Sequence, residues 1–232
     1  MKQFIPLLIC AFLLAGCGTR SISDSGYRQS HGWGRAHNPF YKGELTELDI
    51  LGAAPREDAT EANIAKSLSE AVAPKLKRGD KVILIQSGAP VPDNAMIEEA
   101  GRYFEIAPFS GIPPSEKAGL AESLRLRAAQ GGYRYIVCYW GVLESAQEDK
   151  EGKAVSWVPI LGHFVPDQKQ QMRIRLKALV LDVGSGGWKM LTPEAYSDAS
   201  YNSSWSRETR DQRLVLALKE KGYRSLVAEL LK

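Results

Sequence analysis

The feature that most constrains the folded chain is its amino terminus, where a short apolar run ends at a cysteine. Met1 and Lys2 supply a small positive charge, and residues 4–14 are apolar but too few to span a bilayer as a helix. Small residues and then Cys17 follow directly. This order of charged, apolar and small residues is typical of a secretory signal peptide. We therefore expect residues 1–16 to be a leader that is absent from the folded protein.

The end of this leader, Leu14-Ala15-Gly16-Cys17, resembles the lipobox of bacterial lipoproteins. The resemblance implies cleavage before Cys17, a diacylglyceryl group on its thiol and a fatty acid such as palmitate on its new amino group. Several acyl chains would tether the protein essentially permanently. Gly18, in place of Asp, resembles the pattern that releases lipoproteins to the outer membrane, periplasm-facing, in a diderm host. The alternative is an ordinary secretory leader with an accidental cysteine.

The cysteine count limits how the domain can be stabilised. The chain has three cysteines, of which Cys10 leaves with the leader and Cys17 would carry lipid. Only Cys138 remains, so no intramolecular disulfide is expected. It lies in an apolar run typical of a strand, which indicates a buried, unreactive thiol.

Composition limits the choice of partner and the domain organisation. The formal net charge is +3, nearly balanced, so no nucleic-acid partner is expected. Residues 17–43 are rich in Ser, Gly and Arg without apolar periodicity, and we predict a flexible lipidated tether. Residues 44–232 suit one periplasmic domain. His31 and His37 have no carboxylate or thiol at a metal-binding spacing, so neither a metal nor a cofactor is predicted.

Helical and strand patterns alternate from Asp58 onwards. A cap at Asp58 and an apolar residue at every fourth position predict a helix with one buried face, formed by Ile64, Leu68, Val72 and Leu76. Further strands are predicted at 82–85, 104–109, 133–144, 154–161, 172–180 and 188–191. Further helices are predicted at 93–100, 115–130 and 214–230, the last broken or kinked near Gly222. This order predicts an α/β (α+β) single domain, a mixed sheet flanked by helices with a late antiparallel hairpin and a C-terminal helix.

Two motifs within residues 61–191 carry a second resemblance. A helix ending in glycine leads into the strand sequence Gly132–Val137, and a later hairpin turns at Asp182–Gly186. This order loosely resembles the α/β domain at the N-terminus of the TolB family and in CsgG-like secretion lipoproteins. The resemblance implies an envelope interaction or assembly module, and also a homo-oligomeric secretion subunit as an alternative.

Two surface features are candidates for binding. Arg173, Arg175 and Lys177 form a basic row on one face of a predicted strand, suited to lipid head groups, peptidoglycan carboxylates or an acidic partner. The alternative is a merely solvated face. Trp205 lies in a polar segment, where it would grip a sugar ring or a protein groove, or pack on the C-terminal helix.

No catalytic residue is predicted. His163 and Asp167 would nominally complete a hydrolase triad, but the chain has no Gly-x-Ser-x-Gly elbow, and Ser185 lies in a predicted hairpin turn. The leading hypothesis is an outer-membrane lipoprotein with a non-enzymatic interaction domain for envelope assembly, transport or maintenance. Its expected partners are membrane lipid, through Cys17, and an unknown envelope protein. The competing hypothesis is a lipid-tethered hydrolase acting on cell-wall or peptide material.

Overall fold

A computed structural model of the chain describes residues 20–25, 38, 40–53, 58–116, 118–148, 155–159, 170–200 and 207–232. Several residues singled out from the sequence lie outside the described ranges: Cys10, Cys17, Gly18, His31, His37, His163, Asp167 and Trp205.

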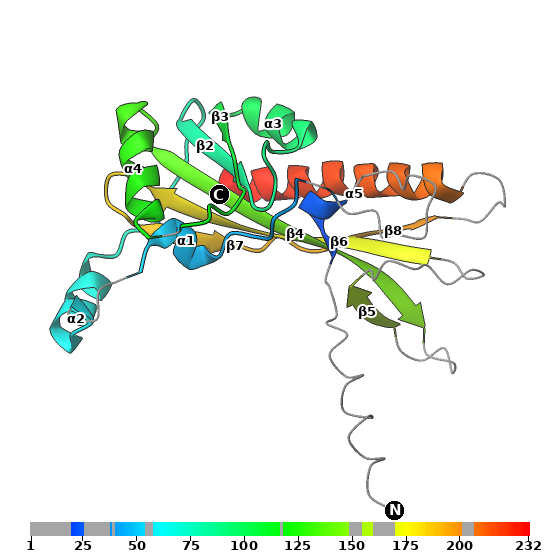
Figure 1. Cartoon of the computed structure of the whole chain (residues 1–232), viewed down its shortest axis with the longest axis horizontal. Coiled ribbons are helices and arrows are strands. Elements are labelled where there is room, and N and C mark those ends of the chain that lie inside the picture. The colour runs from blue at the N-terminus through cyan, green and yellow to red at the C-terminus, as the bar shows by residue number, and fades with distance from the viewer. Residues whose placement is uncertain are drawn as a thin grey trace, which may run out of the picture.

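One mixed sheet organises the described part of the chain (Figure 1). Its main path runs β3–β2–β4–β6–β7, with β1 and β5 paired to β4 and with β8 paired to β6. β2 is parallel to β3 and to β4, and the other described pairs are antiparallel. The strands are β1 (Arg20–Ser21), β2 (Lys81–Gln86), β3 (Glu105–Phe109), β4 (Tyr135–Glu148), β5 (Val155–Pro159), β6 (Gln170–Asp182), β7 (Trp188–Leu191) and β8 (Tyr196–Ser200). The predicted α/β fold with a mixed sheet is confirmed.

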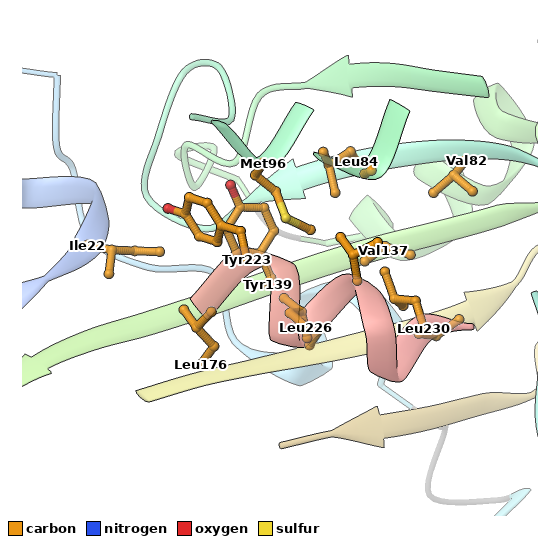
Figure 2. Packing of buried hydrophobic residues seen from close by; sticks show 14 of the residues in the cluster. Ile22, Val82, Leu84, Met96, Val137, Tyr139, Leu176, Tyr223, Leu226 and Leu230 are labelled. Carbon is orange, nitrogen blue, oxygen red and sulfur yellow. The ribbon is translucent and has the colours of Figure 1, made fainter. Parts of the chain in front are cut away.

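Helices cover both faces of the sheet, which explains why its inner strands are apolar on both sides. One face packs against α3 (Asn94–Gly101) and α5 (Arg207–Leu230), through Met96, Tyr223 and Leu226 among others (Figure 2). The other face packs against α1 (Glu47–Leu51) and α4 (Leu120–Gln130). Residues 82–85 of β2 are accordingly all buried, as their continuous apolar run predicts.

The C-terminal helix differs from its prediction. α5 is one continuous helix from Arg207 to Leu230, so the expected break near Gly222 is wrong. A Cβ on Gly222 would lie 3.0 Å from Cδ1 of Leu176 and 3.1 Å from Cγ2 of Ile174. The glycine therefore allows close packing of α5 on β6 instead of breaking the helix.

The helix predicted from Asp58 forms, but its apolar face is not buried. α2 spans Glu61–Glu70, and the Thr60 hydroxyl caps it by accepting a hydrogen bond from the Asn63 amide. None of its residues is buried, and Leu68 is 78% exposed. Figure 1 shows the reason, since α2 stands apart from the sheet at one end of the domain. The predicted buried stripe is wrong except at Leu76, which lies beyond the helix and is buried.

Residues 20–25 also differ from their prediction, because they are part of the folded domain. We call this segment the strap. Arg20 and Ser21 form β1 against Leu143 and Val142, and residues 22–24 form a short 3₁₀ helix, η2 (Ile22–Asp24). Ile22 is only 1% exposed and belongs to the core cluster under α5. The expected flexible tether is therefore wrong for residues 20–25.

A glycine on β4 makes room for the strap. A Cβ on Gly141 would lie 2.9 Å from both Cδ1 and Cγ2 of Ile22 and 2.6 Å from a methyl group of Leu176. Only a residue without a side chain allows Ile22 to fill this part of the core.

Truncating an apolar side chain should affect stability strongly in the strap and very little on α2. Ile22→Ala should lower the free energy of unfolding by about 2–4 kcal/mol, because it leaves a cavity in a packed core. Leu68→Ala should change it by less than about 0.5 kcal/mol, because the Leu68 side chain contacts mainly solvent. Urea unfolding of both variants in a soluble Cys17→Ser background measures the difference. Equal effects of the two truncations would contradict the docked strap.

Candidate functional site

The predicted basic row is engaged by acids of the same domain. On β6, Arg173 Nε lies 2.5 Å from Glu144 Oε2, and Arg175 Nη2 lies 2.7 Å from Glu144 Oε1. Glu144 is 2% exposed, on the adjacent strand β4 and directly opposite Arg173. The two arginines therefore neutralise a buried carboxylate, which would be costly to leave unpaired.

Lys177, the third residue of the row, is also engaged. Its ammonium group donates to Glu47 on α1 and lies 5.0 Å from the centre of the Trp140 ring. The hydrogen bond from Lys177 is the main cause that lowers the pKa of the Glu47 carboxyl. The row thus joins β6 to β4 and α1, and much of its charge is used inside the domain.

A buried polar network, centred on Gln86 at the carboxyl end of β2, holds the strap. The Tyr139 hydroxyl and the Asp93 amide donate to Gln86 Oε1 over 2.6 and 2.8 Å. Gln86 Nε2 donates to the Ser23 hydroxyl over 3.0 Å, and that hydroxyl donates to the Ser87 carbonyl over 2.5 Å. Ser23 therefore completes the hydrogen bonding of two buried polar residues on the sheet.

A buried lysine on α5 fastens the same segment from the other side. Lys219 Nζ donates to the Ile22 carbonyl over 2.9 Å and lies 2.8 Å from Asp93 Oδ2. The Tyr223 hydroxyl donates to the same Asp93 oxygen over 2.5 Å. Burial raises the pKa of both Tyr139 and Tyr223, and Asp93 raises it further, so both phenols stay protonated as donors. Figure 2 shows the two tyrosines beside each other, with Ile22 close by.

A second contact fixes the start of the strap. The Ser21 hydroxyl donates to Glu44, and the Tyr41 hydroxyl lies 3.4 Å from the same carboxylate oxygen. Burial and the charge of Glu44 raise the pKa of Tyr41 to about 12. Nearby, Leu45 is held by its amide to the Ser87 hydroxyl and by its carbonyl to the Trp140 indole.

The network lies at the carboxyl end of a parallel strand, where α/β sheets often bind ligands. In open α/β sheets, ligands bind in the crevice outside the carboxyl ends of the parallel strands. Here Ser23 occupies that position at the end of β2, and its polar partners satisfy one another. The arrangement binds the chain's own N-terminal segment and fixes where that segment leaves the domain. We regard the strap and its partners as the candidate functional site.

Sequence reasoning missed most of this site. The one signal was Gln86-Ser87, two polar residues directly after a fully apolar strand. Lys219 gave no signal, because lysine within an amphipathic helix normally faces solvent. The buried thiol of Cys138 was predicted and is confirmed, and burial raises its pKa well above the usual range.

The described residues contain no group of three or more His, Cys, Asp or Glu placed to hold a metal ion. No helix among them is long and apolar enough to cross a membrane.

The expected lipobox and the mixed α/β domain that follows it are features of a bacterial lipoprotein. The chain belongs to the YafT bacterial lipoprotein family, which matches residues 46–232. The comparisons do not confirm the resemblance to TolB or CsgG.

Among solved structures, two PelC dodecamers from Paraburkholderia phytofirmans have weak similarity to the chain. One is 14% identical with a TM-score of 0.29, and the match covers 67% of this chain and 95% of that chain. The other is 15% identical with a TM-score of 0.27, and the match covers 67% of this chain and 94% of that chain. A search of curated proteins gave no match.

Removing the buried lysine should loosen the strap. We expect Lys219→Met to raise amide hydrogen exchange in residues 20–25, and to lower stability by about 2–4 kcal/mol, because Asp93 and the Ile22 carbonyl each lose a partner. Arg224→Met is the matched control, since Arg224 lies on the same helix in an exposed pair with Glu220. Unchanged exchange in the strap of Lys219→Met would contradict the assigned role.

Proposed function

We propose that this lipoprotein is anchored in the outer membrane of a diderm host through acylated Cys17 and faces the periplasm. Its α/β domain is a non-enzymatic interaction module that serves envelope assembly, transport or maintenance by binding an envelope protein. Membership of a lipoprotein family supports the anchor. The absence of Asp at position 18 supports the outer membrane.

The observation that carries this proposal is the short path from the anchor to the folded sheet. Cys17 lies three positions before Arg20, so even a fully extended chain separates them by only about 10 Å. Arg20 pairs with Leu143, and Ile22 is fixed in the core. The domain is therefore held close to its anchor, within reach of partners in or on that membrane.

The filled crevice supports an interaction role over a small-molecule role. Ser23 lies where an α/β sheet would usually receive a ligand, and Gln86 Nε2 and Lys219 Nζ both donate hydrogen bonds to the strap. A periplasmic partner would therefore contact the outer surface of the domain and not this crevice.

Substitutions at two positions next to the expected cleavage site test the localisation. Cys17→Ser should move the protein from the membrane fraction to the soluble periplasmic fraction, because no acyl chain remains. Gly18→Asp should keep the protein lipidated but shift it to the inner-membrane fraction of a density gradient, while Gly18→Ser should leave it in the outer membrane. Immunoblots of the separated fractions measure both.

Each outcome bears on one part of the proposal. Membrane association that persists in Cys17→Ser would refute lipid as the anchor. An unchanged gradient position of Gly18→Asp would refute the outer-membrane assignment without affecting the lipid.

A further inference from the structure

Two loops at the carboxyl ends of β2 and β3 contain no charged residue. They are residues 87–92, which follow β2, and residues 108–115, which include the last two residues of β3 and the loop after it. Charged residues make up 25% of the chain, so two neighbouring loops without any are a marked departure from its composition. Val91 is 57% exposed and Phe109 is 39% exposed. We call these two loops the tip.

The two loops of the tip are bonded to each other. The Gly88 amide donates to the Gly111 carbonyl, and the Gly111 amide donates to the Ala89 carbonyl, each over 2.8 Å. A Cβ on Gly111 would lie 1.9 Å from the Gln86 carbonyl oxygen, so the loops meet too closely for a side chain at that position. The tip therefore presents its apolar side chains in a fixed arrangement, and little conformational entropy is lost when they bind.

The tip lies beside the strap. The Ser87 carbonyl, at the start of the first loop, accepts the hydrogen bond from the Ser23 hydroxyl. A Cβ on Gly88 would lie 2.8 Å from the ring of Tyr41, so this ring packs directly on the tip. Phe40, the neighbour of Tyr41 in the chain, adds a third exposed apolar side chain, with an exposed fraction of 56%.

The strand directions place the anchor at the same end of the sheet as the tip. β1 is antiparallel to β4, whereas β2 is parallel to both β3 and β4. Followed backwards from Ser21 to Arg20, the chain therefore runs in the direction in which β2 and β3 run. Figure 2 shows Ile22 of the strap on the Leu84 side of β2, toward its carboxyl end. Cys17 precedes Ser23 by six residues, so at most about 22 Å of chain separates them.

The position and the composition of the tip together favour lipid as its partner. Exposed apolar patches mark contacts with proteins or with membranes. A charged side chain is costly inside a membrane, and the tip has none. The bilayer that holds the anchor is an apolar phase, and the short chain to Cys17 brings the tip within its reach.

We propose that the tip inserts among the lipid head groups of the leaflet that holds the anchor, with Val91 and Phe109 in contact with lipid. The backbone of an irregular loop needs hydrogen-bond partners, so the tip enters the head-group layer and not the hydrocarbon core. Such a contact is weak alone, but the anchor raises the effective concentration of the tip at the membrane. This inference rests on the proposed function and adds a second membrane contact beside the lipid.

Fluorescence quenching tests the insertion. The lipidated Val91→Cys protein is labelled with an environment-sensitive fluorophore and reconstituted in vesicles of phosphatidylethanolamine and phosphatidylglycerol. Cys138 is buried and Cys17 carries lipid, so the label is confined to position 91. Lipids with a nitroxide at the top of the acyl chain should quench this label about threefold more than a label on Leu126→Cys, because an inserted side chain lies about 5–10 Å deep. Leu126, on α4, is the matched control, since it is also an aliphatic residue with an exposed fraction of 57%.

A second pair of variants tests the apolar contact itself. In the labelled Val91→Cys protein, Phe109→Glu should reduce the quenching by nitroxide lipid to about the level of the Leu126 label, because it places a charge in the tip. Leu126→Glu should leave the quenching unchanged. Phe109 and Leu126 are both exposed, so circular dichroism should show an intact domain for each variant.

Three results would overturn the proposal: a Val91 label that only aqueous iodide quenches, equal lipid quenching of the Val91 and Leu126 labels, or unchanged quenching in Phe109→Glu. Mass spectrometry of the purified protein reports separately whether Cys17 is acylated. An acylated protein whose tip is not quenched refutes the insertion alone, and a protein without acyl chains refutes the anchor.

Discussion

The fit of Ile22 between β4 and α5 is the contact on which the position of this domain depends. Gly141 leaves the space for the side chain, and Lys219 holds the carbonyl of the same residue. Since the strap continues within a few residues to the expected lipid cysteine, the anchor is joined to the central strand of the sheet.

This arrangement uses polar groups that many α/β domains leave for a ligand. Buried polar networks stabilise a fold when every member is paired and destabilise it when one is left without a partner. The side-chain amide nitrogen of Gln86 donates to the Ser23 hydroxyl. Gln86 therefore has both of its side-chain polar atoms paired only when Ser23 is in place. The domain is consequently complete only when the segment behind the anchor is docked.

The parts of the fold that the sequence predicted are those that local patterns determine. Residues 82–85 have no polar member, which is typical of a strand covered on both faces, and β2 has this burial. Spacing at i and i+4 located α2 and its apolar face, but periodicity does not say what covers that face. The strap was misread for a related reason. Its serines resemble a solvated linker in composition, whereas each makes a specific hydrogen bond in the structure.

Long-range pairing was beyond sequence reasoning in the candidate site as well. The basic row was visible, but Glu144 lies 29 residues before Arg173 and meets it only through the register of β4 and β6. Register depends on the whole sheet, so the neutralisation of the row could not be seen in either strand alone.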